Sequence, residues 1–201
     1  MNSPYDVERN IEMVGCICQS THLKRLKELK QEMKGDCKVY VEIGVLYGGS
    51  MIMMMDMFPY ECLHIGIDAF SGYYGNSYDP HRQIDLTNHY DIAYKNIEKN
   101  NKYRHKFKLI KGNSSDLNVC NQLKEEIDFL FIDGDHSASG VLGDFIQYKD
   151  KVRKGGLIAF DNYNDPSWNQ VKIIVDKIVI LHKNDYKVKE KVGHCLVLEK
   201  L

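Results

Sequence analysis

The sequence predicts an α/β fold: a mostly parallel sheet of seven strands, with helices on both faces and an antiparallel hairpin at the C-terminal end. Two observations predict it. Short β-rich runs alternate with helical segments along most of the 201 residues, and this alternation is typical of a parallel sheet covered by helices. The last two β-rich runs are separated only by a turn at Val192 and Gly193, which favours antiparallel pairing at one edge.

The order of the expected elements follows the apolar periodicity. We expect strands at residues 39–43, 64–67, 106–110, 128–132, 157–160, 186–191 and 194–200. We expect helices at residues 22–33, 50–58, 86–100, 139–152 and 168–181. Two segments should interrupt this order: residues 70–85, rich in Gly, Tyr, Ser, Asn and Pro, as a loop, and residues 154–156 as the stop of the fourth helix.

The chain is expected to form a single domain over residues 1–201, because it shows no repeat, no low-complexity segment and no linker. Residues 1–36 would be an N-terminal helical segment and residues 37–201 the core. In the first helix Leu23, Leu26 and Leu29 recur every three to four residues, which indicates one apolar face on a surface helix. This helix could also serve an interface between copies of the chain, as a homo-oligomer.

Charge and composition exclude several classes of function. The 27 basic and 28 acidic residues give a formal charge of −1, so no basic surface for nucleic acid is expected. The N-terminus lacks the apolar segment of a secretion signal, and the longest apolar run is far too short to span a bilayer. The six cysteines are irregularly spaced, so we expect reduced thiols in a cytoplasmic protein that binds no membrane.

Acidic residues gather at the expected carboxyl ends of the strands, where open α/β sheets bind their ligands. Glu42 comes just before Gly44, and Asp68, Asp133 and Asp161 each follow a β-rich run. The turn at residues 44–49 is rich in glycine but has neither the Lys-Ser/Thr of a phosphate-binding loop nor the Gly-x-Gly-x-x-Gly of a dinucleotide site. An acid before the turn suits a cationic or amino-bearing ligand better than a phosphate.

Three motifs together resemble class I S-adenosylmethionine-dependent methyltransferases, which have a Rossmann-like fold. They are Glu42-x-Gly44-x-x-x-Gly48-Gly49-Ser50, Gly66-Ile67-Asp68 and Phe131-Ile132-Asp133-Gly134-Asp135-His136. The block at residues 128–161, with Trp168-x-x-Val171 after it, resembles the metal-dependent sugar O-methyltransferases that act on rhamnosyl and macrolide sugars. The resemblance covers residues 39–176.

The resemblance implies where S-adenosylmethionine (SAM) would bind. Glu42, Gly44 and Gly48 would line the methionine end, with Ser50 beside them, and Asp68 would hold the ribose. The adenine would be bordered by the segment after the third strand, Asn113, Ser114 and Ser115. Asp133 would contact the cofactor as well.

A divalent cation is expected next to the cofactor. Adjacent parallel strands lie about 4.8 Å apart, so Asp133 can converge with Asp161 and Asn162 at the next strand end. Oxygen ligands with no thiolate nearby suit Mg²⁺ or Mn²⁺, and the resemblance implies the same three ligands. Asn162 departs from the sugar enzymes, which commonly have two acids here, and is closer to the catechol-type pattern. Alternatively, Asp161 and Asn162 cap a helix or turn.

His136 is the candidate general base, with Asp135 as the alternative. A sugar hydroxyl becomes a good nucleophile only when its proton is removed, and an imidazole can accept that proton near neutral pH. His136 lies three residues after Asp133, so both can reach one acceptor oxygen. The related sugar enzymes have a His at this offset, whereas catechol-type enzymes have a Lys.

The sequence therefore predicts a SAM-dependent O-methyltransferase acting on a sugar hydroxyl, of a small molecule or of a rhamnose-type residue in a glycan or glycoside. Two alternatives remain open. One is a catechol or small-phenol O-methyltransferase, which Asn162 favours. The other is a catalytically silent module that binds the cofactor, against which the intact set of Asp133, His136 and Asp161 argues.

Overall fold

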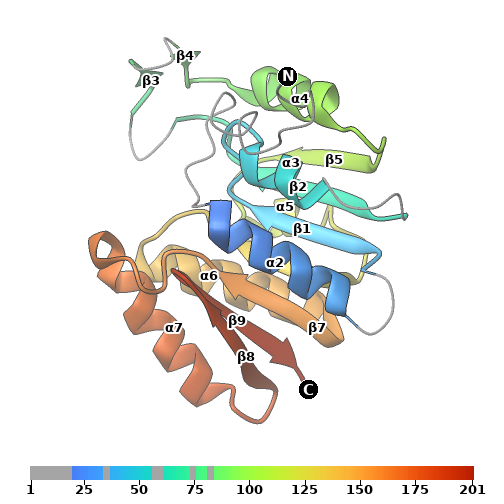
Figure 1. Ribbon diagram of the computed structural model, residues 1–201. Coiled ribbons are helices and arrows are strands. Elements are labelled where there is room, and N and C mark those ends of the chain that lie inside the picture. Colours follow the sequence, from blue (N-terminus) through green and yellow to red (C-terminus); the bar gives the residue numbers. More distant parts are fainter. Residues whose placement is uncertain (1–19, 34–36, 56–60, 73–75, 81–83) are drawn as a thin grey trace.

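The structure is a computed structural model that describes residues 20–33, 37–55, 61–72, 76–80 and 84–201. Its centre is one sheet of seven strands in the order β5-β2-β1-β6-β7-β9-β8. The bounds of the strands, in chain order, are β1 Val39–Ile43, β2 Leu63–Asp68, β5 Lys106–Lys111, β6 Ile127–Ile132, β7 Val152–Phe160, β8 Tyr186–Val192 and β9 Cys195–Lys200. The first five pair in parallel, and β9 pairs antiparallel with both β7 and β8. The predicted fold class is confirmed (Figure 1).

Helices cover both faces of this sheet (Figure 1). Their bounds are α2 Ser20–Glu32, α3 Gly49–Met55, α4 Tyr90–Asn100, α5 Leu117–Cys120, α6 Ala138–Tyr148 and α7 Asn169–Leu181, with short 3-10 turns η1 Lys149–Lys151 and η2 Pro166–Trp168. Alternate residues of a strand point to opposite faces. Leu130 of β6 accordingly packs with Phe145 of α6, whereas Phe129 packs with Leu26 of α2 on the other side.

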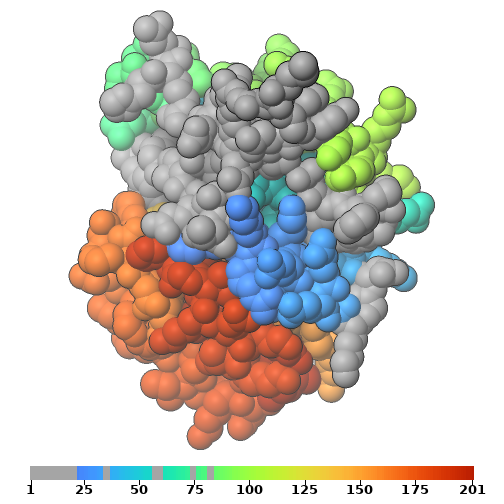
Figure 2. Space-filling model, in the orientation of Figure 1, coloured from blue at the N-terminus to red at the C-terminus, as the bar shows by residue number. Residues whose placement is uncertain are grey.

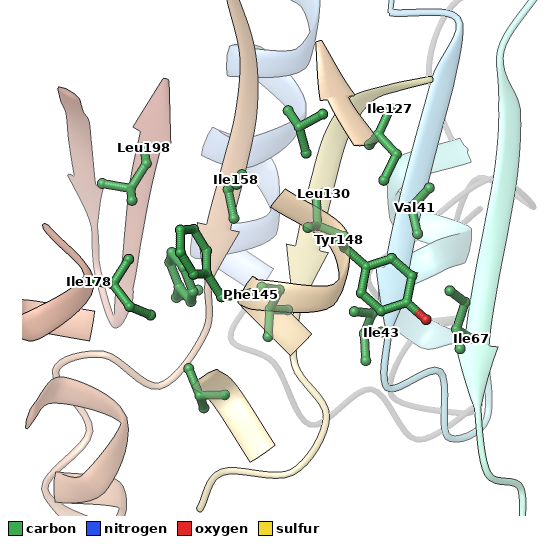
Figure 3. Close-up of a cluster of buried hydrophobic side chains, with 14 of the residues drawn as sticks. Val41, Ile43, Ile67, Ile127, Leu130, Phe145, Tyr148, Ile158, Ile178 and Leu198 are labelled. Carbon is green, nitrogen blue, oxygen red and sulfur yellow. The ribbon is translucent and has the colours of Figure 1, made fainter. Parts of the chain in front are cut away.

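Figure 3 shows the larger core, where α6 covers the sheet. Phe145 and Tyr148 project from α6 onto β1, β2, β6 and β7, among Val41, Ile67 and Ile158. All five side chains are fully buried. Burying such side chains contributes roughly 1.5–3 kcal/mol each, so this layer fixes α6 against the strands whose ends carry the acidic residues.

The expected apolar face of the first helix is confirmed. Leu23, Leu26 and Leu29 of α2 are at most 1% exposed, and they pack with Tyr40 of β1 and Met53 of α3. The guanidinium of Arg25 binds both carboxylate oxygens of Glu190 on β8, at 2.8 and 3.0 Å. Figure 2 shows α2 in blue on the surface beside the red C-terminal strands.

The expected helix over residues 139–152 with a stop at 154–156 is wrong at its end. Helix α6 ends at Tyr148, and β7 already begins at Val152. Ile127 of β6 pairs with Val152, but Phe129 pairs with Leu157, so β7 bulges over residues 153–156. The glycines that looked like a helix stop belong to this bulge, a local feature that periodicity does not report.

The expected loop at residues 70–85 contains a small hairpin instead. Strands β3 Tyr78–Asp79 and β4 Ile84–Asp85 pair antiparallel, with Tyr78 opposite Asp85.

Helix α4 starts at Tyr90, four residues later than expected, and α5 was not expected at all. Residues 56–58, where the second expected helix was to end, lie outside the described residues. Within the described part of the chain, no helix is long and apolar enough to cross a membrane.

Asp128 ties the beginnings of three strands together. Its Oδ2 accepts hydrogen bonds from the main-chain nitrogens of Lys38 and Val39, both at 2.8 Å. Its Oδ1 accepts a hydrogen bond from Nε of Arg153 in the bulge of β7. Asp128 is only 7% exposed, so little water reaches the carboxylate that accepts these hydrogen bonds.

We therefore expect Asp128→Ala to lower the free energy of unfolding by about 2–4 kcal/mol, because it leaves two main-chain donors and a partly buried guanidinium without their acceptor. Urea unfolding followed by circular dichroism measures this. The matched control is Asp150→Ala, whose 80% exposed carboxylate pairs with Lys149. The control should cost about 0.5 kcal/mol or less. Equal losses in the two variants would contradict the role of Asp128.

Candidate active site

A cavity of about 510 Å³ lies at the carboxyl ends of the parallel strands. The register of the sheet explains which residues meet there. Ile43 pairs with Ile67 and with Ile132, and Ile132 pairs with Phe160. The next residue on each strand is therefore in line across the sheet, and these residues are Asp68, Gly44, Asp133 and Asp161, all of which line the cavity.

Gly44 permits the turn that opens the cavity. Its φ is +90°, and a Cβ there would lie 2.0 Å from the main-chain oxygen of Asp133. No residue with a side chain fits so close to a neighbouring backbone. The turn after β1 can therefore lie directly against the end of β6.

Asp68 holds this turn in place. Its Oδ2 accepts hydrogen bonds from the main-chain nitrogens of Val45 and Leu46, at 2.8 and 2.9 Å, and its Oδ1 accepts one from Phe70 at 2.6 Å. A carboxylate offers about four acceptor positions, so one remains for a hydroxyl donor. Asp68 lines the cavity, where the sequence predicts the ribose.

Glu42 lies behind the wall of the cavity. It is completely buried and does not line the cavity, whereas Ser50 does. The Ser50 hydroxyl donates to one Glu42 oxygen at 2.5 Å, and the Tyr40 hydroxyl donates to the other at 2.7 Å. Burial raises the pKa of Glu42 to about 8, although these two hydrogen bonds act in the opposite direction. Glu42 thus positions Ser50.

Of the other residues expected to contact the cofactor, some line the cavity and some do not. Asn113 and Ser114 line the cavity. Ser115 does not, and its carbonyl accepts a hydrogen bond from Gln147 of α6. Gly48 is also absent from the lining. A Cβ at this position would lie 2.6 Å from the side chain of Ile97 of α4. Gly48 therefore serves the packing of α4.

His136 lies beside Asp133 in the cavity wall. Its Nε2 is 3.1 Å from Oδ1 of Asp133, and the edge of its ring meets Trp168 with the ring centroids 4.6 Å apart. Burial lowers the pKa of His136, opposed by the charges of Asp161, Asp135 and Asp165. Desolvation thus favours the neutral imidazole, the form that can accept a proton.

Asp135, the alternative base, is engaged at the start of α6. Its two oxygens accept hydrogen bonds from the main-chain nitrogen and the hydroxyl of Ser137, at 2.9 and 2.8 Å. Like His136, it lines the cavity. Asp135 is exposed, whereas His136 is only 8% exposed.

The three expected metal ligands face the same cavity. Asp133, Asp161 and Asn162 all line the cavity. Asn162 has a φ of +56°, and its side-chain oxygen is buried with no hydrogen-bond partner among the described residues. The alternative that Asp161 and Asn162 cap a helix or turn applies to the turn: both stand in the turn after β7, where the main-chain oxygen of Asn162 accepts from the nitrogen of Asp165 at 3.1 Å. The cap of η2 is Asp165, which accepts from the nitrogen of Ser167.

The expectation that no sulfur lies near these ligands is wrong. The thiol of Cys195 on β9 donates to Oδ1 of Asp161 at 2.9 Å. Sequence reasoning also missed His22 of α2 and His194 of the β8–β9 turn, which both line the cavity. Their positions depend on the hairpin folding back against β7 and α2, and no local pattern in the sequence marks that contact.

The cavity is strongly acidic. Five aspartates line it, namely Asp68, Asp133, Asp135, Asp161 and Asp165, and the lining formed by described residues contains no Lys or Arg. A cavity with this balance attracts cations.

Comparison with known proteins assigns the chain to a family. Residues 41–163 match the model of a methyltransferase domain. The chain belongs to this methyltransferase-domain family. The match begins in β1 and ends just after β7, so it contains the glycine turn and all the acidic strand ends described above.

An uncharacterized protein of Acanthamoeba polyphaga mimivirus, R132, is 35% identical over 162 residues. The match covers 79% of this chain and 66% of that protein, so the chain spans just under two thirds of this relative's length.

Solved structures share the methyltransferase fold. CalS11, a TDP-rhamnose 3'-O-methyltransferase of calicheamicin biosynthesis, superposes with a TM-score of 0.68 at 17% identity, over 98% of this chain and 88% of that one. An O-methyltransferase from Bacillus cereus in complex with SAH gives 0.68 at 20% identity, over 96% and 90% of the two chains. MycE of mycinamycin biosynthesis, in complex with Mg and SAH, gives 0.56 at 18% identity, over 88% and 48%.

The buried state of Glu42 predicts a pH dependence of stability. Its pKa is about 8 in the folded protein and near 4.5 when exposed. Between these values the folded state binds more protons than the unfolded state, so the free energy of unfolding falls as the pH rises. We expect Glu42→Gln to remove this trend, and so to gain on the order of 3 kcal/mol relative to wild type between pH 5 and pH 8.

Urea unfolding at several pH values measures the difference in free energy of unfolding between Glu42→Gln and wild type. The other titrating groups are the same in both proteins, so their contributions cancel. The control is Glu28→Gln on α2, where the carboxylate is 58% exposed. Its profile should run parallel to that of wild type. A Glu42→Gln profile parallel to wild type would instead show that Glu42 is ionised in the folded protein.

Proposed function

We propose that this protein is a SAM-dependent O-methyltransferase that methylates a hydroxyl of a sugar, with a divalent cation assisting deprotonation. The observation that carries the proposal is the convergence of His136, Asp133, Asp161 and Asn162 on one acidic cavity, next to the glycine turn of a methyltransferase domain. The acceptor would be a rhamnose-type residue of a glycan or glycoside.

The cavity fits SAM by its charge and its polar groups. SAM carries a sulfonium and an ammonium group, and the described lining offers five aspartates with no Lys or Arg. Asp68 has one acceptor position left for a ribose hydroxyl. Gly44 and Ser50 border the side proposed for methionine, and Asn113 and Ser114 border the side proposed for adenine.

The donors also fit a divalent cation. Asp133 and Asp161 supply carboxylate oxygens, and the buried side-chain oxygen of Asn162, which lacks a protein partner among the described residues, suits a metal ligand. Carboxylate and amide oxygens are the ligands that Mg²⁺ and Mn²⁺ prefer. When bound, the cation would supply positive charge that favours the deprotonated form of an acceptor hydroxyl.

The chain's own residues would carry the proton transfer. His136 accepts the hydroxyl proton at Nδ1, because its Nε2 is held 3.1 Å from the carboxylate of Asp133, which orients the ring and stabilises the imidazolium. The acceptor oxygen forms a bond to the methyl carbon as the carbon–sulfur bond breaks, and S-adenosylhomocysteine (SAH) leaves. Alignment of the oxygen with the methyl group would supply most of the acceleration.

A catechol or small-phenol acceptor is the second candidate. Asn162, in place of a second acid, favours it, whereas His136 in place of a Lys favours the sugar. CalS11, whose fold is similar, is by its printed name a TDP-rhamnose 3'-O-methyltransferase. This similarity of fold supports the proposal of a sugar acceptor.

Activity is tested by SAH release across rhamnosides, other glycosides and catechols, each with Mg²⁺ and with EDTA. We expect turnover on a glycoside that EDTA abolishes. His136→Ala and Asp133→Asn should each lower kcat/KM by about 10²–10⁴-fold, because the general base or its partner is removed. His182→Gln, at the end of α7 and outside the cavity lining, is the control and should keep full activity.

Two outcomes would contradict the sugar proposal. Turnover on catechols alone would move the protein to the second candidate. Binding of SAH without turnover on any acceptor would favour the silent cofactor-binding module.

Cofactor binding is tested separately at Asp68. Asp68→Asn replaces one of the two oxygens that accept three main-chain hydrogen bonds by an amide nitrogen, so we expect SAH to bind about 10- to 100-fold more weakly by isothermal titration calorimetry. The control is Asp91→Asn, an exposed carboxylate on α4. Equal affinity in both variants would show that Asp68 does not support the cofactor.

A further inference from the structure

Three side chains from distant parts of the chain meet beside the cavity. They are His22 of α2, Asp161 at the end of β7 and Cys195 at the start of β9, and one potential ligand atom of each lies within 4.8 Å of the other two. All three residues are buried. The methyl-transfer chemistry proposed above uses only one of them, Asp161.

We propose that His22, Asp161 and Cys195 bind a zinc-class divalent ion. The set offers one nitrogen, one oxygen and one sulfur, the donors that Zn²⁺ takes in tetrahedral sites. At bond lengths of about 2.0–2.3 Å, tetrahedral ligand atoms lie about 3.4–3.6 Å apart, so the present separations require only small side-chain movements. Mg²⁺ and Mn²⁺ prefer oxygen and are poor partners for a thiolate.

The contact between Cys195 and Asp161 brings a thiol to a carboxylate. The thiol of Cys195 is 2.9 Å from a carboxylate oxygen, whereas Cys37, Cys62 and Cys120 reach main-chain oxygens at 3.4–3.8 Å, and Cys37 and Cys62 also contact each other. Cys195 is completely buried, and Asp161 is 6% exposed. The thiol and the carboxylate are thus closer than the roughly 3.4–3.6 Å between two tetrahedral ligands, so they need to part only slightly to share one cation.

The surrounding charge also favours a dication. Asp133, Asp135 and Asp165 line the same cavity, and no Lys or Arg is among the described residues that do so.

A second imidazole lies beside that of His22, since the ring centroids of His22 and His194 are 5.2 Å apart. Nδ1 of His194 is buried and has no partner among the described residues.

The fold is built to admit His22 at this place. Gly193 has a φ of +56°, and a Cβ there would lie 1.8 Å from Nε2 of His22. One turn along α2, Arg25 binds Glu190 and so holds the helix against the hairpin. Nε2 of His22 now accepts a long hydrogen bond, 3.2 Å, from the main-chain nitrogen of His194. A metal bound at that nitrogen would take over the lone pair.

The geometry further points to an open coordination position. Three protein ligands leave one of four tetrahedral positions vacant, and His22 and Asp161 both line the cavity. A water or an acceptor hydroxyl could fill it. Asp161 is shared with the oxygen site proposed above, so zinc-class and magnesium-class ions would compete for that carboxylate.

Co²⁺ is the direct probe, because a thiolate bound to Co²⁺ gives a ligand-to-metal charge-transfer band in the near ultraviolet. We titrate the full chain, freed of metal by a chelator, with Co²⁺ alone. The expected result is this band at one equivalent, displaced by Zn²⁺ and not by Mg²⁺. Cys195→Ser should abolish the band, and Cys120→Ser, a buried thiol under α6, should keep it.

A second variant leaves the thiol in place. His22→Gln should weaken Co²⁺ binding at least about tenfold while the circular dichroism spectrum stays that of the wild type, and His182→Gln should not change the affinity. Absence of the band in wild type, a band that survives Cys195→Ser, or an unchanged affinity in His22→Gln would each overturn the proposal.

These readouts do not require activity. Co²⁺ binding by a protein that transfers no methyl group would uphold this site and reject the proposed function. Methyl transfer in the presence of Mg²⁺, by a protein that shows no charge-transfer band with Co²⁺, would reject this site and uphold the proposed function.

Discussion

The close approach of two backbones, at Gly44 and Asp133, is the constraint on which the rest of the site depends. Because Gly44 has no side chain, the turn after β1 lies directly on the end of β6, where a Cβ would be 2.0 Å from a main-chain oxygen. Asp68 then fixes the turn through Val45 and Leu46. The cavity is the space that this turn and the neighbouring strand ends leave open.

The acidic character of the cavity follows from the register of the sheet. Consecutive strands end in step, so each acid that follows a β-rich run arrives at the same edge. Bringing several carboxylates together is unfavourable unless cations compensate them. The protonated form of Glu42, favoured by its burial behind Ser50, relieves part of this repulsion. The remaining charge favours the binding of a cationic ligand.

The parts of the fold that follow local patterns could be predicted from the sequence. Periodicity located α2, the five parallel strands and the C-terminal hairpin, and the strand-end rule placed Asp68, Asp133 and Asp161 on one cavity. Errors arose where the backbone departs from regularity. The bulge of β7 looked like a helix stop, and the β3–β4 hairpin looked like a loop, because two-residue strands carry no period.

Contacts between distant segments were beyond reach for a different reason. Cys195 meets Asp161 only because β9 inserts between β7 and β8, and His22 meets both only because α2 packs against the hairpin. Neither residue stands in a motif. Glu42 and Gly48 show the converse: their motif was visible, but the structure places them behind the cavity wall, where they support Ser50 and α4.

The central claim, that this cavity is the SAM site of a methyltransferase, is tested most directly by a crystal structure of the protein with SAH. The account predicts the ribose hydroxyls within hydrogen-bond distance of Asp68, the adenine beside Asn113 and Ser114, and the sulfur facing Asp133 and His136. SAH bound elsewhere, or bound here with its sulfur turned away from His136, would contradict it.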